Sequence, residues 1–338
     1  MCSCNSIALG DGWGYALGEW RGSVHSPGRL DLRRNNRHLT TDHLEIAGVD
    51  AVHHRKHPVP HFLIAQSELP AEREARRRRA GKSSGETYAA TLEQIQPGVA
   101  TTIVSPADDA APVLSTDRLA QFDAVFLTGS PMHVYDDGPA VRRQLDFMRR
   151  VFSAGIPSFG SCAGLQIAVA AAGGRIRKMP KRMEAGIARR IFPTEAGRNH
   201  PLLAGRPPGW DAPAIHGDEV AELPPGATLL ASNAMTHVQA AEVRFDRGIF
   251  WGVQYHPELA LREIAVAIAA QADDLIEAGL ADHEDDVEAW ANDLKALHDT
   301  PGDRSLRWRL GVDGEFAEER LRRREIINFL SNLEALRG

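Results

Sequence analysis

The sequence predicts an α/β fold in which a doubly wound, mostly parallel sheet carries helices on both faces. Between residues 61 and 172, short apolar runs alternate with longer stretches of helical character, an order typical of parallel sheets. Between residues 176 and 254, short strand-like runs follow one another, which predicts a mixed-strand insertion. Beyond residue 258, apolar residues recur at helical spacing, which predicts a helical C-terminal extension.

The predicted parallel core consists of four strands and three helices. The strands are the apolar runs at residues 61–66, 99–104, 124–127 and 156–159. The helices are expected at residues 88–95, 139–154 and 165–172. Pro139 suits the first turn of the second helix, and Gly173 with Gly174 ends the third.

The insertion and the extension follow this core. Strands of the insertion are expected at residues 187–192, 228–231, 238–245 and 249–254. In the extension, Ile264, Ile268, Leu275 and Ile276 lie on one helical face, and a second apolar stripe consists of Ile326, Ile327, Leu330 and Leu333. We expect these helices to pack on the core domain; a surface for a partner protein is the alternative.

Composition bounds the class of protein. Of 338 residues, 43% are apolar and 25% are charged, which is enough to bury a sizeable core. A net charge of −6 gives no electrostatic case for nucleic acid as a partner. No apolar run approaches the roughly 18 residues that a membrane span needs, and no signal-peptide pattern is present. The three cysteines, Cys2, Cys4 and Cys162, favour a reducing compartment, so we expect a cytoplasmic location.

Residues 1–60 differ from the rest of the chain. Seven of the 14 histidines lie at or before position 61, and apolar periodicity is poor. We expect a flexible extension, or a start codon placed too far upstream. The histidines of residues 53–57 lack nearby cysteine or carboxylate ligands at useful spacing, so we expect no metal site. Gly81-Lys82-Ser83 resembles the end of a phosphate loop, but Arg76 stands where that motif needs glycine.

The strongest chemical signal is the run Phe159-Gly160-Ser161-Cys162-Ala163-Gly164, where an apolar strand enters a helix through small residues. Small neighbours permit the sharp turn that lifts a nucleophile out of a sheet. Cys162 would then lie at a helix N-terminus, where backbone N–H groups favour a thiolate and the Ala163 N–H can bind an oxyanion. A buried structural cysteine in a tight turn is the alternative.

A second signal is the strand Gly252-Val253-Gln254-Tyr255, which ends in His256-Pro257-Glu258. Residues two apart in an extended backbone point to the same side, so His256 and Glu258 can reach one site. A catalytic base needs a third group to hold its ring, and a carboxylate does this. Two further segments are the strand end at residues 127–131 and the run at residues 215–220.

With these motifs in this order, residues 61–262 resemble the class I glutamine amidotransferase domain of the Cys-His-Glu triad type. The elbow matches the family's Gly-x-Cys-x-Gly-x-Gln, and Tyr-His-Pro-Glu matches its terminal motif. His-Gly-Asp-Glu-Val matches a segment found in the glutaminase part of GMP synthetase. The resemblance implies a flavodoxin-like doubly wound sheet for residues 61–262, between the extension of residues 1–60 and the helices of residues 263–338.

The resemblance also implies a role for particular residues. Cys162 matches the nucleophile that attacks the γ-amide of glutamine through a thioester, His256 matches the base, and Glu258 matches the residue that orients the base. The oxyanion hole corresponds to backbone N–H groups of Ala163 and of Gly129 or Ser130. The family often has Gly-Gly-Pro in this loop, so a glycine-like conformation would strain Ser130.

Gln166 matches a residue that helps to hold the amino-acid end of the substrate, and His216 and Asp218 are further candidates for binding it. This chemistry requires no metal and no organic cofactor. Cys2 is an alternative nucleophile only if Met1 is removed, and its continuation Ser-Cys-Asn does not fit the unrelated N-terminal class.

Three functions remain open at this point. In the first, the chain is a glutaminase that supplies ammonia to a synthase. The synthase would be a separate subunit, because this sequence lacks the ATP-pyrophosphatase loop that GMP synthetase carries. Alternatively, the same triad hydrolyses γ-glutamyl peptides or amides without a partner. The third alternative is a non-catalytic regulatory module.

Overall fold

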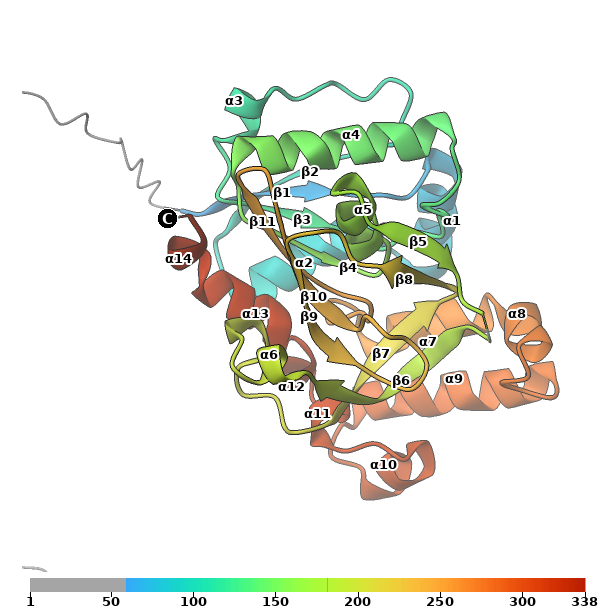
Figure 1. Ribbon diagram of the computed structural model, residues 1–338. Coiled ribbons are helices and arrows are strands. Elements are labelled where there is room, and N and C mark those ends of the chain that lie inside the picture. The colour runs from blue at the N-terminus through green and yellow to red at the C-terminus, as the bar shows by residue number, and fades with distance from the viewer. Residues whose placement is uncertain (1–58, 181, 338) are drawn as a thin grey trace, which may run out of the picture. The chain divides into compact units, whose positions relative to one another are not determined.

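The computed structural model of the chain describes residues 59–180 and 182–337 (Figure 1). The expectations for residues 1–58, including the histidine-rich segment and two of the three cysteines, lie outside this part of the chain. Within the described ranges, no helix is both long enough and apolar enough to cross a bilayer.

A nine-stranded mixed sheet forms the centre of the fold, in the order β2-β1-β3-β4-β11-β10-β9-β6-β7. The strands β2, β1, β3, β4 and β11 pair in parallel, and the remaining neighbours pair antiparallel. The strands of this sheet are β1 (His61–Ala65), β2 (Ala100–Val104), β3 (Ala124–Leu127), β4 (Ser158–Ser161), β6 (Glu184–Pro193), β7 (Trp210–His216), β9 (Ala227–Ser232), β10 (Ala240–Phe245) and β11 (Gly248–Val253). A separate antiparallel ribbon consists of β5 (Arg175–Lys178) and β8 (Asp218–Glu222).

Helices cover both faces of the parallel strands (Figure 1). On one face, α4 and α5 pack against side chains such as Leu63 and Val125. On the other face, α2 and α13 pack against Phe62 and Phe126. Between residues 59 and 200, the described helices are α1 (Pro70–Ala80), α2 (Ser84–Ile95), α3 (Thr116–Leu119), α4 (Pro139–Ala154), α5 (Ala163–Ala171) and α6 (Glu195–Arg198), followed by a 3₁₀ turn at Pro201–Leu203.

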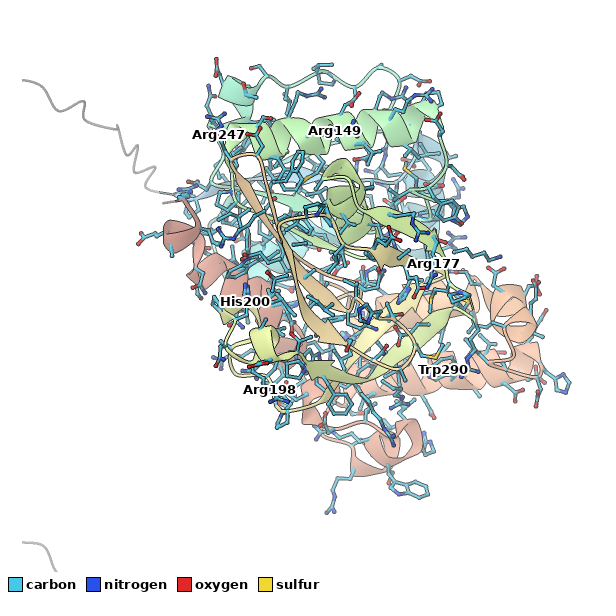
Figure 2. The ribbon with its side chains drawn as sticks, in the orientation of Figure 1. Arg149, Arg177, Arg198, His200, Arg247 and Trp290 are labelled. Atoms are coloured by element: carbon cyan, nitrogen blue, oxygen red, sulfur yellow. The ribbon has the colours of Figure 1, made fainter. Side chains whose placement is uncertain are left out.

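The C-terminal part of the chain is helical, as the sequence predicts. Its helices are α7 (Leu261–Ala269), α8 (Ala272–Glu277), α9 (Glu284–Asp299), α10 (Arg304–Leu310), α11 (Gly314–Ala317), α12 (Glu319–Arg322), α13 (Arg324–Ser331) and α14 (Leu333–Arg337). Helices α7 and α9 share a third apolar cluster with β6. Trp290 on α9, labelled in Figure 2, lies over Gly186 of β6, where a Cβ atom would approach the indole ring within 2.2 Å.

Helix α13 packs one face against the central sheet. The Phe329 ring lies 5.5 Å from that of Phe126, 5.6 Å from Phe159 and 6.0 Å from Trp251, measured between ring centroids. All four side chains are buried. The C-terminal helices therefore complete the core on the face that α2 shares. The division of the chain at residues 60 and 262 stays a prediction.

The predicted fold class is confirmed, and helix α4 has the predicted bounds. Several predicted details differ. Strand β4 begins and ends two residues later in the sequence than predicted. Helix α2 begins earlier than predicted, because Ser83 caps it by accepting a hydrogen bond from the Glu86 N–H. Ser83 thus ends a loop and starts a helix. Strands β5, β7 and β8 were not predicted, because β5 and β8 are rich in charge and β7 contains Pro213.

The position of Phe329 gives a test of this core. Replacing a fully buried phenylalanine with alanine leaves a cavity, so Phe329→Ala should lower the free energy of unfolding by about 3–5 kcal/mol. Trp308→Ala is the control, because Trp308 on α10 is 82% exposed and its loss should leave stability nearly unchanged. Denaturant unfolding measures both; equal losses for the two variants would contradict the packing of α13.

Candidate active site

Cys162 lies at the turn from β4 into α5, with φ 53° and ψ −114°. A non-glycine residue with positive φ costs about 1–3 kcal/mol and persists only where its surroundings hold it. Here the Cys162 N–H donates to the Val253 carbonyl at 2.8 Å, which ties the turn to the end of β11. The side chain is buried, and its Sγ lies 3.9 Å from the Ile215 carbonyl oxygen.

Two glycines allow this turn to form against β3. A Cβ atom on Gly164 would lie 2.5 Å from the Leu127 carbonyl oxygen, closer than real Cβ atoms approach. A Cβ atom on Gly160 would lie 3.0 Å from the Gly164 carbonyl carbon. The start of α5 therefore contacts the end of β3 directly. This close contact explains why the turn needs small residues, as the sequence predicts.

His256 and Glu258 follow the end of β11 and lie side by side. The His256 Nδ1 and the Glu258 Oε1 are 2.8 Å apart, so Nδ1–H donates to the carboxylate. Both side chains are buried. The His256 Nε2 has no hydrogen-bond partner among the described residues, and both His256 and Cys162 line one cavity. The geometry leaves Nε2 free to take a proton inside that cavity.

The electrostatics of His256 favour its protonated form. Burial lowers the pKa of the imidazole, but the charge of Glu258, then the charge of Cys162, and the hydrogen bond to Glu258 outweigh burial and raise the pKa to about 10. A base that gains this much affinity for a proton from its two neighbours is suited to hold the proton of the Cys162 thiol.

The loop after β3 passes over these side chains. A Cβ atom on Gly129 would lie 2.8 Å from the His256 Cε1, so only glycine fits there without displacing the ring. The Thr128 Oγ1 donates to the Gly129 carbonyl at 3.0 Å. The strain considered for Ser130 is absent, because the only non-glycine residues with positive φ among those described are Cys162, Arg190 and Asp246.

The three predicted substrate-binding side chains lie together beside the same cavity. The Gln166 Nε2 donates to the Asp218 carbonyl at 3.1 Å, and the His216 Nδ1 lies 2.9 Å from the same oxygen. The His216 Nε2 lies 3.1 Å from the Glu184 Oε2. Both ring nitrogens of His216 are therefore engaged within the protein, and contact of these residues with a substrate stays a prediction.

Sequence reasoning missed several side chains of this region. His133 and Tyr135, in the loop after β3, hold the Asp218 carboxylate at 2.7 and 3.2 Å. Ser161 on β4 donates to Glu258, and Tyr88 on α2 pairs with Ser161. The sequence signal available for Ser161 was its place next to the nucleophile, and for His133 its place after a strand end; Tyr88 carried none.

A cavity of about 980 Å³ opens from Cys162. Its walls include Cys162, His256 and Gly129, and they extend to residues of α1, α7 and α8, among them Ala267. In residues 59–180 and 182–337, no cluster of histidine, cysteine and carboxylate groups is arranged to hold a metal ion.

Comparisons with known proteins identify the family and the relatives of this chain. The family model of glutamine amidotransferase class I matches residues 81–272. The γ-glutamyl-L-1-hydroxyisopropylamide hydrolase of a Pseudomonas species is 33% identical over 279 residues, which cover 80% of this chain and 92% of that enzyme. A glutamine-hydrolysing GMP synthase from Leifsonia xyli subsp. xyli is 33% identical over 144 residues, or 43% of this chain. The match covers only 27% of that synthase, so the chain spans about a quarter of its length.

The fold is similar to that of a solved glutamine amidotransferase from Thermotoga maritima. The TM-score is 0.50 at 18% sequence identity, with 75% of this chain and 98% of that chain covered. At this level of identity the likeness concerns the fold alone.

The contact between Gly129 and His256 gives a second test. Gly129→Ala should displace the imidazole ring and slow the alkylation of Cys162 by iodoacetamide at neutral pH toward the rate of an ordinary thiol. Gly138→Ala is the matched control, because a Cβ atom at Gly138 meets nothing within 4 Å. An unchanged alkylation rate in Gly129→Ala, with a folded protein, would show that the ring is not held against this loop.

Proposed function

The chain belongs to the class I glutamine amidotransferase family, and on this premise we propose that it hydrolyses γ-glutamyl amides, glutamine among them, with Cys162 as the nucleophile. The observation that carries the proposal is a strained cysteine and a buried His256–Glu258 pair lining one large cavity. The proposed catalytic domain is residues 61–262, and the proposed location is the cytoplasm.

The reaction has two steps. The Cys162 thiol gives its proton to the His256 Nε2, and the sulfur attacks the γ-carbonyl carbon of the substrate. The tetrahedral intermediate collapses to a γ-glutamyl thioester, and His256 passes its proton to the departing nitrogen, which leaves as ammonia or an amine. Water, deprotonated by His256, then attacks the thioester, so that glutamate leaves and the thiol is restored.

Two further groups serve these steps. Glu258 holds the His256 ring by accepting from Nδ1, which keeps Nε2 directed at the cavity and stabilises the imidazolium. Backbone N–H groups of Ala163 and of Gly129 or Ser130 stabilise the oxyanion. Because the Thr128 hydroxyl binds the Gly129 carbonyl, the Ser130 N–H of the same planar peptide points the opposite way.

The leaving group is proposed to be larger than ammonia. Cavities of about 300–1,000 Å³ accommodate ligands much larger than an amino acid, and this one measures about 980 Å³ and extends to α1, α7 and α8. The Pseudomonas relative, which matches 80% of this chain, is named for hydrolysis of a substituted γ-glutamyl amide. Both observations favour an amine as the leaving group.

A second candidate is a glutaminase that supplies ammonia to a separate synthase subunit. It is supported by the similarity to the Leifsonia GMP synthase, of which this chain matches about a quarter. In that case the synthase would be another chain, and the wide cavity would serve the docked partner.

A substrate panel separates these candidates. We expect the purified chain to release glutamate from γ-glutamyl amides of several amines at higher kcat/KM than from glutamine. Turnover should disappear in Cys162→Ala, with folding of the variant checked by circular dichroism. Glutaminase activity alone, dependent on an added synthase, would favour the second candidate, and no turnover by the wild-type chain in either assay would favour a regulatory module.

The cavity wall from α7 tests the size of the leaving group. Ala267→Phe should narrow the cavity and lower kcat/KM for amides of bulky amines by about tenfold or more, with a smaller effect on glutamine. Ala269→Phe is the control on the same helix, because Ala269 is exposed and does not line the cavity. An equal effect of Ala267→Phe on every substrate would contradict a leaving-group site at α7.

A further inference from the structure

A chain of buried hydrogen bonds runs behind the proposed catalytic pair. The Tyr88 hydroxyl lies 2.6 Å from the Ser161 Oγ, which donates to the Glu258 Oε1 at 2.9 Å. The same Oε1 accepts from the His256 Nδ1 at 2.8 Å. Tyr88 and Ser161 are fully buried, so water does not compete for these bonds.

The direction of each hydrogen bond in this chain is fixed. A carboxylate only accepts, so the single hydroxyl proton of Ser161 goes to Glu258. Tyr88 must then be the donor to Ser161. Burial, followed by the charge of Glu258, raises the pKa of Tyr88 well above its usual value, so its proton stays in place.

Secondary structure explains why these groups meet. Phe159 and Ser161 are two residues apart on β4, so both side chains point to the face of the sheet that α2 covers. Cys162 starts the turn into α5. Tyr88 projects from α2 into the same layer. These hydrogen bonds thus connect α2, through Tyr88 and Ser161, to the Glu258 carboxylate that holds His256.

We propose that Ser161 and Tyr88 are positioning residues that fix the orientation and charge of Glu258, and through it the ring of His256. This inference rests on the proposed function for the role of His256. Glu258 receives side-chain donors at Oε1, while its Oε2 has no partner among the described residues. Ser161 is therefore the group that prevents the carboxylate from rotating away from the imidazole.

The expected effects differ in size. A hydrogen bond to a charged group contributes enough that Ser161→Ala should lower kcat by about 10- to 150-fold. The neutral Tyr88 bond predicts a loss of about 2- to 12-fold in Tyr88→Phe. KM should change little in either variant, because neither side chain lines the cavity. Ser158→Ala is the control, since Ser158 is a buried β4 serine that donates only to the Ile249 carbonyl.

The double variant gives the sharpest reading. Because Tyr88 acts through Ser161, Tyr88→Phe should add no further loss in the Ser161→Ala background. The rate of Cys162 alkylation should follow the same pattern, and it needs no substrate, so it separates this inference from failure of the proposed function. Two results would overturn the inference. One is a kcat and an alkylation rate within twofold of wild type in both single variants; the other is a double variant in which the losses of the two single variants multiply.

Discussion

The backbone of Cys162 is held in a conformation that an ordinary residue avoids, and the arrangement around it follows from that constraint. Its positive φ is held by the hydrogen bond from its N–H to the Val253 carbonyl. It also depends on glycine at positions 160 and 164, because only glycine lets α5 contact the end of β3. Because β3, β4 and β11 run parallel, the residues that follow them meet at one edge of the sheet. The nucleophile, the loop over it and the histidine therefore share one site.

The segment that carries His256 is held from behind as well as from the sheet. The preceding Tyr255 donates to the Glu325 Oε1 at 2.9 Å, and Arg206 pairs with the same carboxylate at 2.7 Å. These side chains are buried, and removing one member of a buried ion pair would leave its partner uncompensated. Helix α13, which supplies Glu325, thus supports the strand end next to the proposed base. The C-terminal helices are in this sense part of the site's scaffold.

The parts of the site that could be predicted from the sequence are those that short local motifs encode. Cys162, His256 and Glu258 stand in short motifs at strand ends, and parallel strand ends meet by geometry, so their proximity could be anticipated. The bonds from Tyr88 to Ser161 and from His133 to Asp218 join positions 73 and 85 residues apart, and no periodicity encodes them. Strands β5 and β8 were missed because a charged ribbon pair lacks the apolar alternation of a half-buried strand. The strain considered at Ser130 lies instead at Cys162, where the turn is sharpest.

The proposed function requires that Cys162, activated by His256, forms a covalent bond to the γ-carbonyl carbon of the substrate. The most direct measurement is labelling of the full chain with a glutamine-analogue electrophile, followed by peptide mass spectrometry of all three cysteines. We expect modification of Cys162, suppression of this modification by a γ-glutamyl substrate, and its loss in His256→Ala. Modification of Cys2 or Cys4 with Cys162 left intact would contradict it.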